Sequence, residues 1–258
     1  MKWKTLISVV LALTVLASYL VVSTGFADIK QQDLVCSELR IHVCDSLTNN
    51  FIRPADVKNI LTSEGIKTVG VRMCHINTYE MIQLLNSRNV IKNTGVFTSV
   101  DGVLHINVCQ RRPIMRIQAA TGSFYIDDSG YIFPLSGVHT SYVPVMTGNV
   151  PMKIPAGFRG AIPEKETFLQ QVYSLALYLD KNSFWQSQLT QLDVIDAANV
   201  CMIPREGNHV IYMGSLAEYE YKFKKLLAFY AKVCPADDDI YGSVDLRYSN
   251  QIVCKKRK

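Results

Sequence analysis

The most constraining feature of the sequence is an uncharged, largely apolar run of 23 residues near its start, from Thr5 to Ala27. As a helix this run would be about 34 Å long, enough to cross a hydrocarbon layer of about 30 Å. Its apolar residues lie on every side of the helix, so a helix packed against the core of a soluble protein would have no polar face to expose to water. Lys2 and Lys4 precede the run, and the basic flank of a membrane-spanning helix usually stays in the cytoplasm. We therefore predict a cytoplasmic tail at 1–4, a transmembrane helix at 5–24, and a periplasmic body.

A cleaved signal peptide is the alternative to an uncleaved anchor. Gly25-Phe26-Ala27 resembles the small-x-small cleavage site of such a peptide, and cleavage would leave Asp28 as the first residue. The apolar run is longer than the usual hydrophobic region of a signal peptide, which favours the anchor. Both alternatives carry residues 28–258 across the membrane.

The charge distribution argues against a nucleic-acid-binding protein. Six of the 27 Lys and Arg residues lie at the two ends of the chain, four of them at 255–258. The remaining 21 basic residues are balanced by 22 acidic residues, so the body of the chain is nearly neutral. A domain that binds nucleic acid would carry a basic excess in its body.

The exported part holds seven cysteines, an odd number that cannot pair completely within one chain. No Cys-x-x-Cys pair or metal-type spacing occurs, so we predict no metal site. Buried thiols that pack as small apolar groups are one interpretation, and a disulfide in an oxidising compartment is the other. The seven are Cys36, Cys44, Cys74, Cys109, Cys201, Cys234 and Cys254.

The first part of the body, 34–112, has the predicted order strand, helix, helix, strand, strand. Period-two alternation over 35–43 predicts the first strand. Pro54 suits a first helical position, and Asn77 with a glutamate three residues later predicts the start of the second helix. Asp101-Gly102 then predicts a hairpin turn between two strands.

The second part, 113–258, is predicted to form a mostly antiparallel sheet with two main helices. Asp127-Asp128-Ser129-Gly130 separates two strand-like runs and predicts a hairpin. Two helices are predicted next, one over 164–181 and one after Ser215, where Glu218 completes the pattern of a capping box. Their apolar stripes are Phe168, Val172, Leu175 and Leu179 in the first helix, and Phe223, Leu226, Leu227, Tyr230 and Val233 in the second. Tyr241–Tyr248 reads as the last strand, and a terminal strand often lies at a sheet edge. The predicted fold class is therefore α+β.

The motifs of common enzymes are missing from the sequence. Neither His-Glu-x-x-His nor Gly-x-Ser-x-Gly occurs, and neither do the glycine-rich phosphate-binding patterns. The five histidines have no zinc-type spacing. The pair Asp127-Asp128 is better explained as turn acids than as a general acid and base. We therefore predict that the chain binds no cofactor and is not an enzyme.

Several stretches are similar to sequences of the FtsQ/DivIB cell-division family. The order of the first part also resembles a POTRA domain, a small extracytoplasmic module for protein docking. A short basic tail, one span, a POTRA-like domain and an α/β domain that ends in a late strand form the layout of that family. The similar stretches are Asp101-Gly102-Val103-Leu104-His105-Ile106 leading to Gln110-Arg111-Arg112-Pro113, Tyr125-Ile126-Asp127-Asp128-Ser129-Gly130, Phe133-Pro134-Leu135-Ser136, Val143-Pro144-Val145-Met146-Thr147-Gly148 and Val244-Asp245-Leu246-Arg247-Tyr248.

The resemblance implies a non-enzymatic scaffold of the division machinery in the inner membrane, located at the septum. It implies binding to the small bitopic proteins FtsB and FtsL, which leads on to the septal peptidoglycan synthases. The implied mode is β-augmentation, in which a partner strand adds to the edge of the last strand. The residues expected to contact the partner are Val244, Asp245, Leu246, Arg247, Tyr248, Ser249, Asn250, Gln251 and Ile252.

The POTRA-like order also has a consequence for the thiols. By alternation Cys109 faces away from the core, as do Cys36 and Cys44 of the first strand. The first and third strands of a POTRA-like sheet are neighbours, so one of the first-strand thiols is expected within disulfide reach of Cys109.

Two other functions stay open at the level of sequence. One is an exported hydrolase with a dispersed Ser/His/Asp or Cys/His site. The other is a different docking or translocation component that carries a POTRA domain. The latter would normally be followed by a long β-barrel, whereas two helices occupy much of the second part here.

Overall fold

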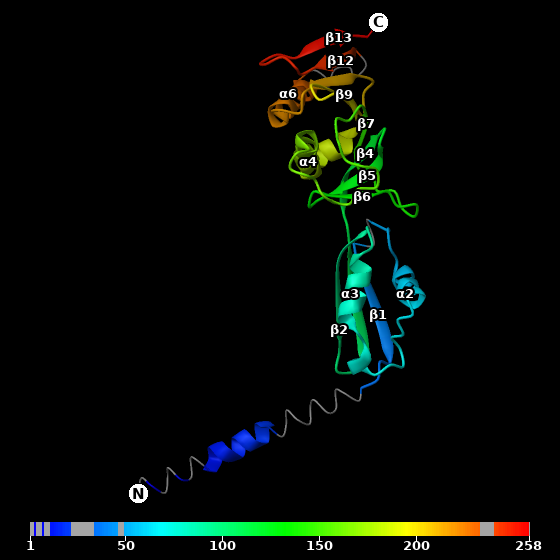
Figure 1. The fold of residues 1–258 in the computed structure, drawn as a ribbon. Helices are drawn as coiled ribbons and strands as arrows, with labels where there is room; N and C mark the ends of the chain where they lie inside the picture. Colours follow the sequence, from blue (N-terminus) through cyan, green and yellow to red (C-terminus); the bar gives the residue numbers. More distant parts are fainter. Residues whose placement is uncertain are drawn as a thin grey trace. The chain divides into compact units, whose positions relative to one another are not determined.

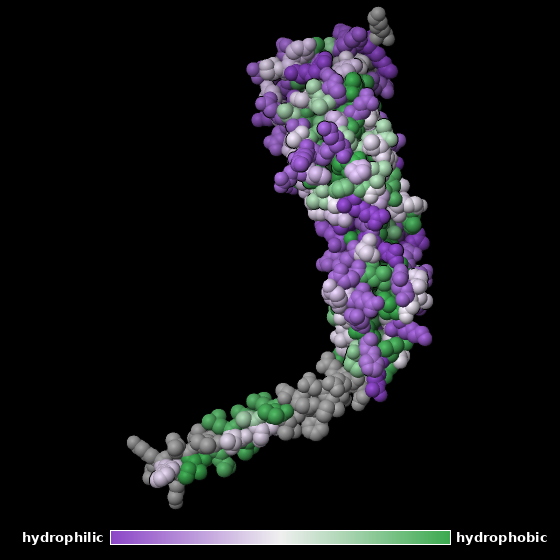
Figure 2. Space-filling model, viewed as in Figure 1, coloured by the Kyte–Doolittle hydropathy of each residue, from purple (hydrophilic) through white to green (hydrophobic). Residues whose placement is uncertain are grey.

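The computed structural model describes residues 3, 7, 11–21, 34–45, 49–232 and 240–257. Residues 11–21 are helical, and the visible side of this helix is mostly hydrophobic (Figure 2). The rest of the predicted span at 5–24, apart from residue 7, lies outside the described residues. A search of the described helices finds none with the length and apolar character needed to cross a bilayer. The chain divides into two units, 1–110 and 111–258 (Figure 1).

The first unit holds the predicted order of strand, helix, helix, strand, strand. Its three-stranded sheet has the order β1-β3-β2, in which β1 runs parallel to β3 and β2 runs antiparallel to it. Its elements are β1 (Glu38–Cys44), α2 (Pro54–Ser63), the 3-10 turn η1 (Met73–His75), α3 (Thr78–Asn86), β2 (Ile91–Thr98) and β3 (Val103–Gln110).

The predicted helix starts and hairpin turn of the first unit are confirmed. Pro54 is the first residue of α2, a position whose N–H would have no partner within the helix, so proline loses no hydrogen bond there. The side-chain oxygen of Asn77 accepts a hydrogen bond from the N–H of Glu80, which caps α3. Gly102 adopts a φ of 85° in the turn between β2 and β3, in the region that favours glycine. Leu61, Leu85 and the inward side chains of β3 then form one core.

The first strand begins later than the alternation predicts, and this corrects the orientation of Cys36. The residues before Glu38 pair with the segment 70–72, through the N–H of Cys36 and the carbonyl oxygen of Val71 among others. This separate pairing breaks the alternation, so Cys36 is buried at 1% exposure and Val35 faces outward. The expectation that Cys36 faces away from the core is therefore wrong.

The second unit is built on a single sheet of ten strands. Its order is β13-β12-β11-β10-β9-β7-β4-β5-β6-β8, and most neighbouring pairs are antiparallel, as predicted. The strands are β4 (Pro113–Ala119), β5 (Gly122–Asp127), β6 (Tyr131–Pro134), β7 (Val145–Gly148), β8 (Gly160–Ala161), β9 (Leu189–Asp196), β10 (Asn199–Pro204), β11 (Val210–Gly214), β12 (Tyr241–Asp245) and β13 (Val253–Lys256). The helices are α4 (Thr167–Asp180), α5 (Ser183–Gln188) and α6 (Tyr219–Lys232).

The helices α4 and α6 lie on the same side of this sheet (Figure 1). The predicted stripe of α4 is confirmed, since Phe168, Val172, Leu175 and Leu179 are all buried in the core of the unit.

The start and the inner face of α6 differ from the prediction. Glu218 has a φ of 53° and α6 begins one residue later, so the capping box with Ser215 does not form. The inner face contains Phe229, and Leu227 is 47% exposed. The predicted stripe included both Leu226 and Leu227, but a helix can turn only one of two adjacent positions inward, and in α6 that position is Leu226.

The end of the sheet also corrects the prediction of a terminal strand at Tyr241–Tyr248. The strand β12 ends at Asp245, and a further strand, β13, pairs with it antiparallel. On its other side β12 pairs parallel with β11. Both edges of β12 are therefore occupied, and β13 is the last strand at this end of the sheet among the described residues.

The short strand β7 joins the two halves of the sheet. It runs parallel to β4 on one side and to β9 on the other. Its last residue, Gly148, has a φ of 91°, and a Cβ there would collide with the carbonyl oxygen of Val194. The glycine of the stretch Val143–Gly148 is thus needed for a close approach of two backbones.

Candidate functional site

The candidate site is the end of the large sheet formed by β12, the loop 246–252, β13 and the adjacent face of α6, here called the terminal edge. Hydrophilic residues gather at this end of the unit in Figure 2, where Figure 1 labels β12 and β13. The strand β13 is exposed except for Cys254, and no described strand pairs with its outer side. Such an edge presents unpaired N–H and C=O groups to a further strand.

The predicted partner-binding residues divide into buried and exposed positions. Val244 and Leu246 lie in the core at 0% and 1% exposure, so their side chains hold the edge in place and face no partner. Asp245 and Ile252 are half-buried. The exposed members are Arg247, Tyr248, Ser249, Asn250 and Gln251, all in the loop between β12 and β13.

Asp245 and Arg247 form an ion pair on the surface of the terminal edge. A guanidinium nitrogen of Arg247 lies 2.6 Å from a carboxylate oxygen of Asp245. The hydrogen bond from Arg247 lowers the pKa of Asp245 below its ordinary value, and burial opposes that shift. The guanidinium also lies over the ring of Tyr212, 5.6 Å from its centroid. The exposed charge of Arg247 is thus oriented before any partner arrives.

The loop 246–252 is held on α6 by two side chains of that helix. The ammonium of Lys225 donates to the carbonyl oxygens of Leu246 at 3.0 Å and Tyr248 at 2.6 Å. The hydroxyl of Tyr221 donates to the side-chain oxygen of Asn250 at 2.8 Å and accepts from the N–H of the same residue. Asn250 adopts a φ of 60°, a region that asparagine tolerates better than most residues. The predicted strand 241–248 is therefore a strand followed by a fixed loop.

A groove of about 660 Å³ lies beside this loop, between α6 and the strands β12 and β13. Phe229, Tyr241 and Ile252 supply its apolar lining, and Lys232 and Lys256 line it as well. Lys255 and Arg257 add exposed positive charge to the same edge. The terminal edge thus combines an open strand, an apolar groove and basic side chains.

The sequence prediction missed β13 and Lys225. The signals for β13 were the turn residues Ser249-Asn250 and the β-branched pair Ile252-Val253 that follows them. Lys225 carries no signal in the sequence, because its role depends on carbonyl groups that are 21 or more residues away.

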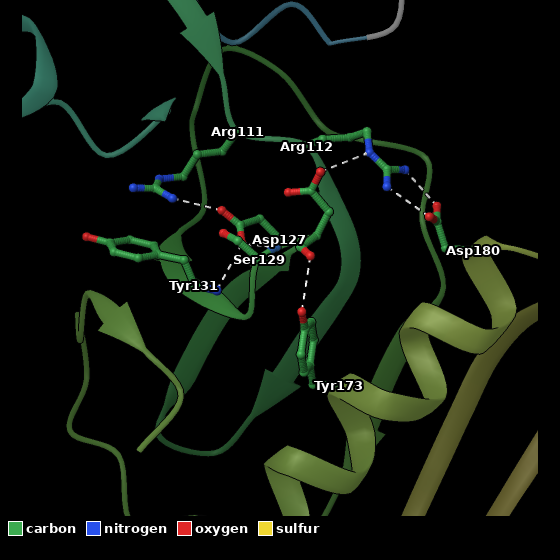
Figure 3. A network of polar contacts seen from close by, with 8 residues as sticks. Arg111, Arg112, Asp127, Ser129, Tyr131, Tyr173 and Asp180 are labelled. Carbon is green, nitrogen blue, oxygen red and sulfur yellow. Dashed lines mark hydrogen bonds and ion pairs between the residues drawn. The ribbon is translucent and has the colours of Figure 1, made fainter. Parts of the chain in front are cut away.

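A second polar cluster, at the start of the second unit, contains two of the family-like stretches (Figure 3). Asp127 is fully buried and pairs with Arg111 at 2.8 Å. Its other carboxylate oxygen accepts hydrogen bonds from the N–H groups of Ser129 and Tyr131. The interpretation of Asp127 as a turn acid is confirmed. The guanidinium of Arg111 also lies 3.5 Å from the centre of the Tyr131 ring.

Arg112 extends this cluster to α4. Its guanidinium makes two parallel hydrogen bonds to Asp180, at 2.7 and 2.8 Å, and they raise the pKa of Arg112. Tyr173 donates from its hydroxyl to the carbonyl oxygen of Asp128. The cluster therefore fastens β4, the β5–β6 turn and α4 together, and its charges are used within the fold.

The described residues offer little to metal chemistry. Across the described ranges, no three side chains of His, Cys, Asp or Glu lie close enough together to hold a metal ion. His209 is buried at 6% exposure, and its ring nitrogen lies 3.0 Å from the hydroxyl of Tyr230.

Comparison with protein families shows which family the chain belongs to. The family described as FtsQ/DivIB, C-terminal related, matches residues 112–255, more than half of the 258 residues. The chain belongs to the FtsQ/DivIB family. A POTRA-like domain matches residues 34–109. The resemblance inferred from the sequence is therefore confirmed, and FtsQ/DivIB membership associates the chain with bacterial cell division. Among curated proteins, no match is found.

Proposed function

We propose that this FtsQ/DivIB protein is a non-enzymatic scaffold of the bacterial division machinery, bitopic in the inner membrane and recruiting FtsB-like and FtsL-like partners to the septum. The observation that carries the proposal is the terminal edge, an open strand beside an apolar groove in the FtsQ/DivIB-related domain. The POTRA-like domain fits the same role, since such modules dock other proteins.

The partner is proposed to add a strand to the outer side of β13. Because β12 is paired on both sides, an incoming strand meets β13 first. Main-chain hydrogen bonds to β13 would supply affinity, and the groove beside α6 would receive apolar side chains from the partner's adjoining segment. Arg247 and Tyr248, both exposed in the loop before β13 and both of a type common in interface hot spots, are proposed to contact the partner as well.

The charge of the terminal edge selects the chemistry of the partner segment. Lys232, Lys255, Lys256 and Arg257 are exposed at this edge. A partner strand flanked by aspartate and glutamate would complement them and associate faster at low salt.

Site-specific photocrosslinking tests the docking site. A photoreactive amino acid at Val253 or Lys255 should crosslink to the FtsB-like protein of the same organism, identified with a tag. The same amino acid at Lys165, an exposed lysine outside the terminal edge, should not. Crosslinks that form at Lys165 but not on β13 would locate the docking surface elsewhere.

Charge reversal provides an independent test of the same surface. The double variant K255E/K256E should weaken binding of the FtsB-like protein at least about tenfold, which is about 1.4 kcal/mol. The Tyr248→Ala variant should weaken the same binding by at least about 2 kcal/mol while the protein stays folded. The K165E variant should bind as the unchanged protein does, and calorimetry measures all three affinities.

Depletion in the native bacterium tests the cellular role. Filaments with unfinished septa are expected when the protein is depleted, and normal division would contradict the proposal.

A further inference from the structure

We propose that Cys44 and Cys109 form a disulfide that joins β1 to β3 in the first unit. The two residues are direct partners in the parallel pairing of these strands, so their side chains leave the sheet on the same face. They are 65 residues apart in the sequence. The proposal needs an oxidising compartment, and so shares the membrane topology of the proposed function, but it needs none of the partner binding.

The distance between the two sulfur atoms carries the proposal. The Sγ atoms lie 3.0 Å apart, closer than the roughly 3.5–4.0 Å at which even two carbon atoms make optimal contact. A disulfide bond is about 2.05 Å long and suits Cα separations of about 4.4–6.8 Å, a range that includes adjacent strands of a sheet. A shift of about 1 Å by two side chains therefore completes the bond.

The surroundings of the pair favour access by an oxidant. Both thiols are half-exposed, on the face of the sheet opposite the core, as are Asn107 and His105 of β3. Cys36, the other first-strand thiol, is buried at 1% exposure. The β1–β3 register and the burial of Cys36 together identify Cys44 as the partner of Cys109.

The end of β1 beside the pair is held in place by Gln110. Its amide nitrogen donates to the carbonyl oxygens of Cys44 and Asn49, and its oxygen accepts from the N–H groups of Phe51 and Ile52. Gln110 is itself buried at 4% exposure, and it directly follows Cys109 in the chain. Both cysteines are therefore attached to a fixed backbone, which keeps their sulfur atoms at this distance.

The bond forms by exchange with the disulfide of a thiol–disulfide oxidoreductase. The thiolate of one cysteine attacks that disulfide and releases one thiol of the oxidant, and the second cysteine then displaces the other. The pair loses two electrons and two protons, and the oxidant ends as two thiols. The hydrogen bond to Cys44, with burial second, raises the pKa of Cys109 to about 11. This raised pKa makes Cys109 a poorer nucleophile near neutral pH than an ordinary thiol would be.

Peptide mapping of the full chain tests the proposal. Free thiols in native membranes are alkylated without reduction, and the digest is searched for a linked pair of peptides containing Cys44 and Cys109. The link should persist in C74S, which removes an exposed thiol of the same unit. In C44S, Cys109 should become fully alkylated. Alkylation of both Cys44 and Cys109 in the unchanged chain, or a link from either to another cysteine, would overturn the proposal.

Thermal unfolding gives a second readout that does not depend on peptide recovery. Closing a loop of this length stabilises a domain, so a reductant should lower the melting temperature of the first unit by at least about 5 °C. It should leave the C44S/C109S double variant unchanged. An equal effect of the reductant on both proteins would count against the disulfide. Oxidised glutathione added to the purified full chain should restore the link, and failure there would refute the geometry independently of membrane topology.

Discussion

Two ion pairs at the start of the second unit differ in burial, and this difference decides their importance for stability. Asp127 is completely buried and Arg111 is 12% exposed, whereas Arg112 is 43% and Asp180 is 17% exposed in the other pair. Removing one partner of a buried pair leaves the other charge without compensation in a region of low dielectric. An exposed pair is screened by water and contributes little.

We predict that Asp127→Ala lowers the free energy of unfolding of the second unit by about 3 kcal/mol. Besides its ion pair, this variant loses the hydrogen bonds from Ser129 and Tyr131. The matched variant Asp180→Ala should cost at most about 1 kcal/mol. Urea denaturation of the two variants measures the difference, and equal losses would contradict the assigned roles.

The pair of Asp245 and Arg247 makes stability depend on pH at the terminal edge. Arg247 lowers the pKa of Asp245 below its ordinary value of 3.8. The contribution of this ion pair to the free energy of unfolding is therefore fully present above pH 3.8, the ordinary pKa. It is lost as the pH falls through the lower pKa that Asp245 has in the folded state. Asp245→Asn should lower the melting temperature at neutral pH and make no difference in strong acid. A difference that persists in strong acid would show that the pair is not its source.

At the scale of elements, α6 determines the shape of the loop that leads from β12 to β13. One ammonium, that of Lys225, bonds to main-chain oxygens of the loop, and burial lowers the pKa of Lys225. The inner face of α6 thus packs in the core, and Lys225 at the border of that face holds the loop.

We predict that Lys225→Met loosens the loop 246–252 at a cost of about 1–2 kcal/mol, because hydrogen bonds from a charged donor are among the stronger ones. Lys224→Met changes an exposed neighbour on the same helix and is the control. Hydrogen exchange of residues 248–252 should speed up in the first variant alone. Equal exchange in both variants would mean that the loop holds its shape without Lys225.

At the scale of the whole molecule, the proposed topology rests on the sequence of the first 27 residues. We predict that protease added to spheroplasts digests the body, because the uncharged run follows two lysines. Protection of the body would contradict the proposed topology. An N-terminus at Asp28 in the mature protein would identify a cleaved signal peptide.

The elements that could be predicted from sequence are those with local causes. The capping residue Asn77, the turn glycine Gly102 and the stripe of α4 all act within a few residues of their position. The family could be recognised for a similar reason, since several of its motifs hold turns, such as the one that Asp127 caps through Ser129 and Tyr131.

What could not be predicted depends on contacts between distant residues. The outward turn of Val35 follows from pairing with Arg72, and the interior position of β12 follows from pairing with β13. Alternation along one strand contains no information about which other strand covers its edge. The segment named from the sequence, 244–252, therefore lies at the terminal edge, but the open strand there is β13 and not the predicted strand at 241–248.

The position of β7 has a consequence for the order in which the second unit assembles. The hairpins β4–β5–β6 and β9–β10–β11 are local and can form early, whereas β7 has parallel partners on both sides that come from distant segments. Parallel pairing across long segments is slow, because loop closure must come before the contacts that reward it. We therefore expect the two hairpin groups to form first and the insertion of β7 to limit the refolding rate. A substitution such as Met146→Ala should slow refolding more than an equally destabilising change in β10.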